Sequence, residues 1–349
     1  MYQNVIDSDL QDGIDSKDLA KNLEHWMTEL PQQLRRVPII YLAIPGSHDS
    51  FTVDITMNSK VAPDAEKILQ KLQCLLCLRY IMARWSKTQS YSASEQLRSG
   101  IRFFDLRIAT KEREDNLYFV HGLYSDEVQT VLDDIVSFLE THPQEVVILD
   151  CQHFYGFTRQ THIRFMQLLT STFGAKLLPY TEHMDFLTLE YLTTLFGYQV
   201  ITVYRSDEAR FGQPLLWPSA NFPNPWPNTY NQTDLFNDLD SGLKSRSLSV
   251  GFVSQCILTP SLSYIFKNLF SNLKDKCGFD LEDIRTRWIS KQCPGPNGGF
   301  NIVIADFVDL SDNLFAKTVI NLNLKLLNVQ NLKPCYPILT IVNEANNKY

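Results

Sequence analysis

Two histidines in this chain follow apolar runs of the length that forms a buried strand. Residues 42–51 read LAIPGSHDSF, so His48 and Asp49 come directly after a run that breaks at a proline-glycine pair. The second histidine, His121, ends the run LYFVH. Imidazole exchanges protons near neutral pH, so one histidine can begin a reaction as a base while the other begins it as an acid.

Carboxylates and an arginine stand at comparable positions. In the run GIRFFDLRIAT alternate side chains share a face of a strand, which puts Asp105 and Arg107 on one face and leaves the other face apolar. Asp306 closes the run NIVIAD. The carboxyl ends of parallel strands meet at one edge of a sheet, where α/β enzymes hold their sites. We therefore expect one cluster made of His48, Asp49, Arg107, His121 and Asp306.

These residue types suit the transfer of a phosphoryl group to an internal hydroxyl. Cleavage of a phosphodiester needs a base, an acid, and a cation that meets the charge on the equatorial oxygens. The two histidines would act as base and acid, each oriented by a carboxylate, and Arg107 would be the cation. A structural salt bridge between Asp105 and Arg107, or strand ends that are unrelated to one another, are the alternatives that the residues leave open.

The elements that must position this cluster are strands alternating with helices. Apolar runs of strand length cover residues 37–44, 101–109, 117–121, 145–151, 198–205, 249–258 and 300–308. The clearest helix is expected to start after Ser125 as its N-cap, to repeat apolar residues from Val128 to Leu139 at helical spacing, and to stop before Pro143. The alternation predicts an α/β fold with a parallel sheet covered by helices, either a (β/α) barrel or a doubly wound sheet.

The flanks and one internal segment read differently from this pattern. Residues 1–35 are predicted to be a polar N-terminal extension with one short helix, residues 36–325 the domain, and residues 326–349 a C-terminal segment. The segment 214–230 carries five prolines, so it is predicted to be irregular. It is either a lid or rim of the site, or a loop packed by its own side chains.

Composition excludes several classes of protein. The chain of 349 residues has a formal net charge of −7 and no basic block, so nucleic acid is not an expected partner. Seven scattered cysteines favour reduced thiols in the cytosol, and the pair Cys74 and Cys77 lacks the second pair that a zinc site needs. We find no apolar signal region and no run of about 18 uncharged apolar residues, so neither secretion nor a transmembrane segment is expected.

Five motifs in this order resemble one family. They are IPGSHDSF, GIRFFDLRI, FVHGLYS, EVVILDCQHFYGF and NIVIADFVDL. Together they resemble the X domain of phosphatidylinositol-specific phospholipase C, and more closely the short proteins that contain this domain and little else, from about residue 35 to about residue 325. The resemblance implies a single distorted TIM-type (β/α) barrel. It also implies a phosphoric diester hydrolase that cleaves phosphatidylinositol-type lipids to diacylglycerol and an inositol phosphate.

The resemblance gives each member of the cluster a role. His48 matches the base that takes the proton of the inositol 2-hydroxyl, and His121 matches the acid that protonates the departing diacylglycerol oxygen. Asp49 and Asp306 match the carboxylates that orient the two imidazoles in the bacterial enzymes.

Arg107 separates this chain from the calcium-dependent members of the family. Those enzymes have an asparagine directly after the first histidine and acidic residues at the positions held here by Arg107 and, approximately, Gln152. Of that set only Asp105 keeps its charge here, and one carboxylate beside an arginine is a poor site for a cation that prefers six or more oxygens. We therefore expect catalysis without a metal or other cofactor, with the guanidinium of Arg107 in place of the ion.

Further positions are expected to bind substrate or membrane. Arg205 and Trp217 resemble inositol-contacting positions of the bacterial type, and Gln152 and His153 follow a strand that ends at the same edge. Trp217 is also expected, with Phe222 and Trp226, to form a rim that contacts a membrane. The remaining histidines are interpreted as structural residues: His25, His142, His162 and His183.

The expected partner is an inositol phospholipid at a membrane surface, met by a cytoplasmic protein that binds the membrane transiently. Such an activity belongs to lipid degradation and signal transduction. Two rivals remain: a catalytically retired barrel that binds phosphoinositides or proteins, and a glycerophosphodiester phosphodiesterase. The second requires a set of metal-binding carboxylates that is not evident in the sequence.

Overall fold

One sheet of eight strands forms the centre of the molecule. The computed structural model describes residues 18–72 and 75–328. Six strands run parallel to their neighbours in the order β6 (Val200–Tyr204), β5 (Val147–Tyr155), β2 (Phe103–Thr110), β1 (Ile44–Ser47), β8 (Ile302–Ala305) and β7 (Val253–Gln255). The expected α/β fold with a parallel sheet is confirmed, and the apolar runs that predicted these strands overlap each of them.

The proline-rich segment lies between the two edge strands of this sheet. Thr202 on β6 accepts a hydrogen bond from the backbone of Trp217 at 2.8 Å, and Val253 on β7 donates one to the carbonyl of Pro223 at 2.9 Å. Within the described chain no ladder joins β6 directly to β7, so residues 217–223 bridge the seam of a distorted barrel. This segment is therefore part of the barrel wall.

The strand that ends in His121 runs in the opposite direction to the sequence-based expectation. β3 (Leu117–His121) pairs antiparallel with the outer half of β2, and β4 (Leu123–Glu127) pairs antiparallel with β3. The turn after Thr110 is only a few residues long, and such a connection joins antiparallel strands because a parallel crossover needs a dozen residues or more. β3 thus returns from the tip of the hairpin and carries His121 back toward Arg107.

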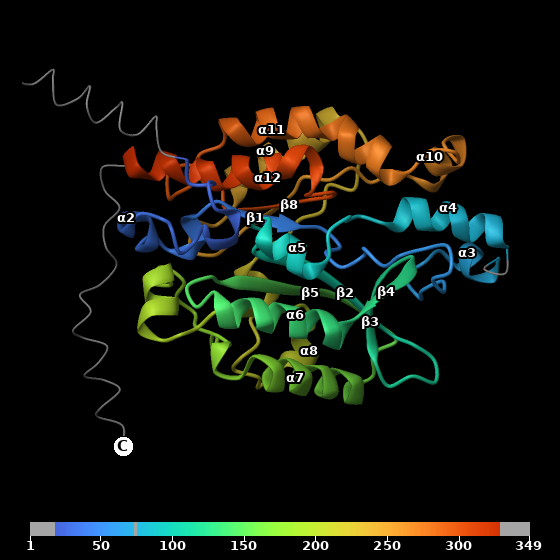
Figure 1. Ribbon diagram of the computed structural model, residues 1–349, viewed down its shortest axis with the longest axis horizontal. Coiled ribbons are helices and arrows are strands. Elements are labelled where there is room, and N and C mark those ends of the chain that lie inside the picture. Colours follow the sequence, from blue (N-terminus) through green and yellow to red (C-terminus); the bar gives the residue numbers. More distant parts are fainter. Residues whose placement is uncertain (1–17, 73–74, 329–349) are drawn as a thin grey trace, which may run out of the picture.

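Helices cover both sides of the sheet (Figure 1). On one side lie α6 (Val128–Thr141) and α7 (Arg159–Phe173), and on the other α9 (Gln232–Ser245), α11 (Asp280–Lys291) and α12 (Leu310–Asn321). The hairpin β3–β4, α3 (Lys67–Lys71), α4 (Leu76–Ser86) and α10 (Leu262–Lys267) gather at one end of the molecule, and α2 (Gln32–Arg35) lies at the other. The remaining helices are α5 (Ala93–Arg98) and α8 (Asp207–Arg210). The short 3-10 and π turns are Leu23–His25, Ile39–Tyr41, Gly174–Lys176, Glu190–Leu195, Ser219–Asn221, Lys274–Phe279 and Leu322–Asn328.

Two element boundaries differ from the prediction. The run 37–44 is a 3-10 turn followed by the start of β1, because only its last residue pairs with β8. Helix α6 follows the predicted apolar spacing, but Glu127 occupies its N-cap, and Ser125 lies within β4. The polar residues that suggested a cap belong to the strand that precedes the helix.

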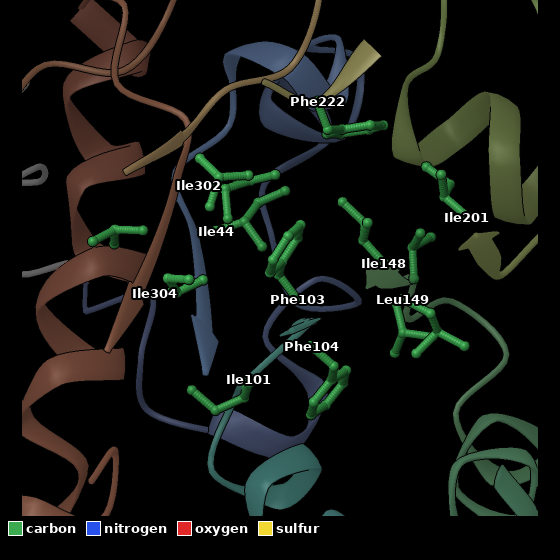
Figure 2. Packing of buried hydrophobic residues seen from close by; sticks show 14 of the residues in the cluster. Ile44, Ile101, Phe103, Phe104, Ile148, Leu149, Ile201, Phe222, Ile302 and Ile304 are labelled. Atoms are coloured by element: carbon green, nitrogen blue, oxygen red, sulfur yellow. The ribbon is translucent and has the colours of Figure 1, made fainter. Parts of the chain in front are cut away.

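The core is built from the inward faces of the strands (Figure 2). Ile44, Phe103, Ile148 and Ile302 pack together with almost no exposed surface. Gly46 on β1 allows the neighbouring strands to approach, since a Cβ atom there would lie 2.8 Å from Cβ of Phe103 and 2.9 Å from Cγ2 of Ile304. A larger residue at this position would push β1, and the histidine that follows it, out of the sheet.

The N-terminal boundary that we predicted is wrong for the part of it that the structure describes. Trp26 and Met27 are fully buried, and the indole of Trp26 donates a hydrogen bond to the carbonyl of Gly100 at 2.9 Å. Thr28 donates to the buried carboxylate of Glu145, which is also paired with Arg102. Residues 18–35 therefore belong to the core of the domain, because their apolar side chains close one end of the barrel.

Other sequence-based predictions fall partly outside the described residues. Cys74 lies outside them, whereas Cys77 is exposed on α4 as a free thiol. The predicted C-terminal segment 326–349 is described only at its start, where Leu326 is buried. None of the helices in the described ranges has the length and apolar character that a bilayer crossing requires.

Candidate active site

A cavity of about 300 Å³ opens near the carboxyl ends of β1, β2 and β8. The charged and titratable side chains that line it include His48, Asp64, Arg107, His121 and Asp306. Asp49 lies beneath them and is almost fully buried. The structure therefore brings together all five members of the predicted cluster, although they come from four strands far apart in the sequence.

Asp49 is the centre of this cluster. Its Oδ1 lies 2.7 Å from Nε of Arg107, and its Oδ2 lies 3.3 Å from Nε2 of His121 and 3.5 Å from Nε2 of His48. Burial opposes the negative charge of Asp49, but Arg107 and the two imidazoles outweigh it and lower the pKa of this carboxyl. Asp49 is therefore a buried anion that three positively charged or protonatable groups share.

His48 is held at both ring nitrogens. Nδ1 lies 2.8 Å from Oδ1 of Asp306, which makes Nδ1 the nitrogen that carries a proton and donates it. Nε2 lies 3.0 Å from Nη2 of Arg107, and a guanidinium only donates, so Nε2 presents a lone pair here. Burial lowers the pKa of His48, but Asp49 and Asp306 more than compensate and raise it above its usual value. The contacts at the two nitrogens fit the neutral ring of His48, and its raised pKa means that Nε2 accepts a proton readily.

His121 has a different arrangement. Its Nδ1 lies 2.7 Å from the carbonyl oxygen of Ser86, which can only accept, so Nδ1 carries a proton. Its Nε2 faces the carboxylate of Asp49. A protonated ring would therefore donate toward an oxygen from each nitrogen. The ring centroids of His48 and His121 are 6.2 Å apart and the rings meet edge to face, so both imidazoles face one volume.

Arg107 and Asp105 complete the charge pattern. Burial disfavours the guanidinium of Arg107, but Asp49 and Asp105 outweigh this and raise its pKa, so it stays charged. Burial and the proximity of Asp49 raise the pKa of Asp105 to about 6. Asp105 also accepts a hydrogen bond from the backbone of Asp49 at 3.1 Å, which fixes the residue after His48. Asp105 is thus both a structural acceptor and a site that exchanges a proton near neutral pH.

The turn that follows β1 is held by residues that sequence reasoning did not identify. Asp49 adopts a φ of 39°, a conformation that is uncommon outside glycine. Gln89 donates hydrogen bonds at 2.9 Å to the carbonyls of His48 and Ala305, and Thr88 donates to the carbonyl of Asp49 at 2.8 Å. Only the position of Gln89 in the fold reveals this role, because the residue lies in a loop without a recognisable pattern.

Two of the predicted substrate-binding residues form a second cluster beside the first. Arg205 makes a bidentate salt bridge to the buried Asp150, with Nε at 2.7 Å and Nη2 at 2.8 Å. Gln152 and Asn224 each donate to the same carboxylate at 3.2 Å. Asp150 stands opposite Asp105 in the ladder between β5 and β2. The two clusters are therefore neighbours, and the polar side chains of Arg205 and Gln152 lie beside the first cluster.

Trp217 was predicted to contact inositol and, with Phe222, a membrane, and both predictions are wrong in this structure. Trp217 is fully buried and its indole donates to the carbonyl of Leu178 at 2.9 Å. Phe222 lies among core residues such as Ile148 and Ile302 (Figure 2). The cause is the position of this segment in the barrel seam, where its aromatic residues fill the interior. Trp226 is 53% exposed and lines the cavity, so it alone keeps the predicted location.

The other histidines differ in their surroundings. His153 is paired with Arg107 in the β2–β5 ladder and is exposed, and burial of part of its ring together with Arg107 lowers its pKa. His162 bonds the hydroxyl of Tyr204 at 2.7 Å, and His142 stacks on Phe138. His153 is thus beside the site, whereas His162 and His142 have structural partners.

The residues do not fit a calcium ion. Within the described chain, His48, Asp49 and Asp105 each place one potential ligand atom within 4.8 Å of the others. This set offers two carboxylates and a nitrogen, whereas calcium takes six to eight oxygens. The guanidinium of Arg107 also lies 2.7 Å from Asp49 and would repel a dication there.

Comparison with known proteins places these residues in a family context. A family model described as phosphatidylinositol-specific phospholipase C, X domain, matches residues 79–196. PI-PLC X domain-containing protein 3 of Mus musculus is 40% identical over 303 residues, which cover 85% of this chain and 92% of the mouse protein. PI-PLC X domain-containing protein 1 of Homo sapiens is 35% identical over 311 residues, which cover 87% of this chain and 93% of the human protein.

Two solved structures that match this chain are bacterial enzymes. The phosphatidylinositol-specific phospholipase C from Listeria monocytogenes matches with a TM-score of 0.58 at 18% identity, covering 86% of this chain and 98% of the bacterial one. A mutant of the corresponding enzyme from Staphylococcus aureus matches with a TM-score of 0.61 at 16% identity, covering 88% and 98%. The likeness is one of fold, and it confirms the predicted distorted TIM-type barrel.

The pair formed by His48 and Asp306 can be tested by titration. The change Asp306→Asn removes a negative charge next to the ring, and the imidazolium loses that stabilisation. The pKa of His48 should therefore fall, by about one to two pH units, in an NMR titration of protein labelled in its histidines. Asp312→Asn is the matched control, because that exposed carboxylate pairs with Lys317. An unchanged titration of His48 in Asp306→Asn would contradict the arrangement described above.

Proposed function

The chain belongs to the family of proteins that contain the X domain of phosphatidylinositol-specific phospholipase C, and from this premise we propose that it is a metal-independent phosphodiesterase. Its substrates would be phosphatidylinositol-type lipids. The products would be diacylglycerol and an inositol phosphate, formed through a 1,2-cyclic phosphate.

One observation carries the proposal. A single buried carboxylate, Asp49, lies within 3.5 Å of two imidazoles that open on one cavity, and within 2.7 Å of a guanidinium. The two imidazoles differ in their second partner, a carboxylate for His48 and a backbone carbonyl for His121. Different partners give two imidazoles different affinities for a proton. A reaction that uses one imidazole as base and the other as acid requires such a difference.

His48 is suited to the first step. Its Nε2 presents a lone pair, so it can take the proton of the inositol 2-hydroxyl while that oxygen forms a bond to phosphorus. Asp306 on Nδ1 then stabilises the imidazolium that results. In the structure Nη2 of Arg107 bonds Nε2 of His48. When the inositol hydroxyl takes the place of Nη2 at this nitrogen, the guanidinium would turn toward the phosphate oxygens.

His121 is suited to the second part of the step. As the bond from phosphorus to the glycerol oxygen breaks, the proton on Nε2 of His121 passes to that oxygen and diacylglycerol leaves. Arg107 meets the charge on the equatorial oxygens throughout. Water then opens the cyclic phosphate with the roles of the imidazoles reversed, since each now holds the proton state that the other began with.

The neighbouring polar cluster is suited to the inositol ring. Asp150, Arg205, Gln152 and Asn224 offer donors and acceptors beside Asp105, and His153 adds an exposed imidazole at the same edge. Vicinal hydroxyls need such mixed partners because each is both donor and acceptor. The rigid bidentate pair between Arg205 and Asp150 would hold this surface in place before substrate arrives.

The decisive experiment follows the products of purified protein and phosphatidylinositol in mixed micelles by phosphorus NMR. A cyclic phosphate signal should appear, and His121→Ala should lower its rate of formation by at least about a hundredfold, the size of a general-acid contribution. His183→Ala is the matched control, since that histidine is exposed and outside the cavity. Absence of turnover in every lipid presentation would instead favour the rival, a barrel that binds inositol lipids without cleaving them.

The role of Arg107 predicts an activity that needs no metal. A millimolar chelator should leave the rate unchanged, because a guanidinium fixed by the chain cannot be extracted. Arg107→Lys should lower turnover by a factor that corresponds to roughly 3 to 4 kcal/mol, since an ammonium cannot bridge two phosphate oxygens. Lys111→Arg, in the turn directly after the same strand and outside the cavity lining, serves as the control. Activity that is lost on chelation and returns with calcium would overturn this assignment.

The walls of the cavity are suited to a membrane surface. Leu69 and Met82 from α3 and α4, and Ile265 and Phe266 from α10, line it. Exposed apolar side chains continue from these walls, namely Ile68, Leu72, Leu76, Tyr80, Leu262 and Phe270. The helices also carry cations, Lys67, Lys71, Arg79, Arg84 and Lys267, and such a combination binds anionic lipid. We place the protein in the cytoplasm, with transient contact to membranes through α3, α4 and α10.

This surface can be separated from the catalytic residues by substrate form. Leu76→Glu combined with Phe270→Glu should lower the rate on anionic vesicles by about tenfold or more, because charges replace apolar contacts with the bilayer. The rate on a monomeric short-chain phosphatidylinositol should stay within about twofold. Leu195→Glu is the control, being similarly exposed (52% against 59% for Leu76) but located before the amino end of β6. Equal losses on both substrates would assign α4 and α10 to the pocket alone.

A further inference from the structure

The turn that carries His121 is held by a segment that contains none of the family motifs. Ala62 donates a hydrogen bond to the carbonyl of Gly122 at 3.0 Å, and Tyr124 donates to the carbonyl of Lys60 at 3.0 Å. Oδ2 of Asp64 accepts a hydrogen bond from the backbone nitrogen of Gly122 at 2.7 Å. Residues 60–64 therefore lie along the turn, and Asp64 is bonded to the residue directly after the histidine.

The second oxygen of Asp64 is unusual. Oδ1 is buried and has no hydrogen-bond partner within the part of the chain that the structure describes, and the side chain lines the cavity beside His121. Burial raises the pKa of Asp64, and the bond from Gly122 and the positive charge of His121 oppose that rise. An unpartnered buried oxygen costs free energy unless a charge nearby compensates it. The protonatable ring of His121 is positioned to supply that charge.

The other groups around this cavity do not duplicate Asp64. The charged and titratable neighbours are His48 and Asp49 after β1, Asp105 and Arg107 on β2, Tyr155 on β5, Asp306 after β8, and Asp64 and Glu66 before α3. The negative charge of Asp49 is already paired with Arg107 at 2.7 Å, and Asp306 is bonded to His48. Helix α4 contributes only the uncharged carbonyl of Ser86 to the ring. Oδ2 of Asp49 also faces Nε2 of His121 at 3.3 Å, but it lies 3.5 Å from His48 as well. Asp64 is therefore a second carboxylate beside His121, bonded to the backbone of the next residue.

We propose that Asp64 is a positioning residue for the acid of the reaction: its hydrogen bond fixes the turn after His121, and its charge keeps that imidazole protonated. The kinetic part of this inference rests on the proposed function, whereas the effect on the ring does not. Because the phosphoryl-transfer step needs His121 to start as the cation, a carboxylate that favours the cation extends activity to higher pH.

The test is the change Asp64→Asn. The amide still offers an oxygen to the backbone of Gly122 but no negative charge, so the imidazolium of His121 should lose its proton at a lower pH than in the unchanged protein. We expect a displacement of about 0.5 to 1 pH unit in an NMR titration of histidine-labelled protein without substrate. The alkaline limb of kcat/KM on a monomeric short-chain phosphatidylinositol should move by the same amount. At the alkaline end this is a loss of about threefold to tenfold, whereas the acidic limb should not move.

Matched variants separate charge from structure. Glu112→Gln removes an exposed carboxylate that does not line the cavity and should leave both readouts unchanged. If Asp64→Asn does not fold, Asp64→Ser provides a small acceptor for Gly122 without charge and should give the same displacement. Titration of His121 that is unaffected by either variant would overturn the inference. An intact displacement in a protein without turnover would uphold the inference about the ring and refute the proposed function instead.

Discussion

The carboxylate of Asp49 is the constraint on which the rest of the site depends. A buried anion costs several kcal/mol unless cations or strong donors surround it, and here the compensation comes from Arg107 on β2 and from two imidazoles that belong to β1 and to the β3 hairpin. The burial of Asp49 as an anion depends on all three of these partners together. Removal of Arg107 would leave the negative charge of Asp49 undercompensated, and displacement of either ring would remove part of the same compensation. The site is therefore one electrostatic unit, not a set of residues that happen to be close.

The fold meets this constraint by means that are specific to a few positions. Gly46 lets β1 lie between β2 and β8, which brings His48 and Asp49 to the height at which Asp105 and Asp306 can bond them. β2 continues beyond its pairing with β1 and gives its outer half to β3. An antiparallel return is the shortest way to bring a second histidine back to the level of Arg107. The segment before α3 and the end of α4 then hold the turn, through Asp64 and Ser86.

Much of this site could be predicted from the sequence, because the relevant signals are local. Alternation along one strand was enough to put Asp105 and Arg107 on one face, and His48 and Asp306 were predicted from strand ends. The antiparallel direction of β3 was missed because periodicity is the same for either strand direction. His121 does lie in the predicted cluster, but an antiparallel return brings it there and not the carboxyl end of a parallel strand. Trp217 and Phe222 were misplaced because their exposure depends on the seam between β6 and β7, which no local pattern encodes. Asp64 and Gln89 were missed for a similar cause: their roles consist of contacts to backbone atoms more than 40 residues away.

The balance of charge in the cavity bears on whether the barrel cleaves its ligand or only binds it. A phosphodiester is an anion, and a site that evolved only to hold it would gain from every cation and lose from every buried carboxylate. This site combines one arginine with Asp49, Asp64, Asp105 and Asp306, so carboxylates outnumber the permanent cation. Such a surplus weakens the binding of an anion, but Asp49 and Asp306 raise the pKa of His48, which makes that imidazole a stronger base for the proton of a hydroxyl. The pKa of Asp105, raised to about 6 by burial first and by Asp49 next, adds a group that can take up a proton when a substrate anion arrives. The arrangement is costly for a binding module and useful for acid–base catalysis, and this asymmetry favours the enzyme over the retired barrel.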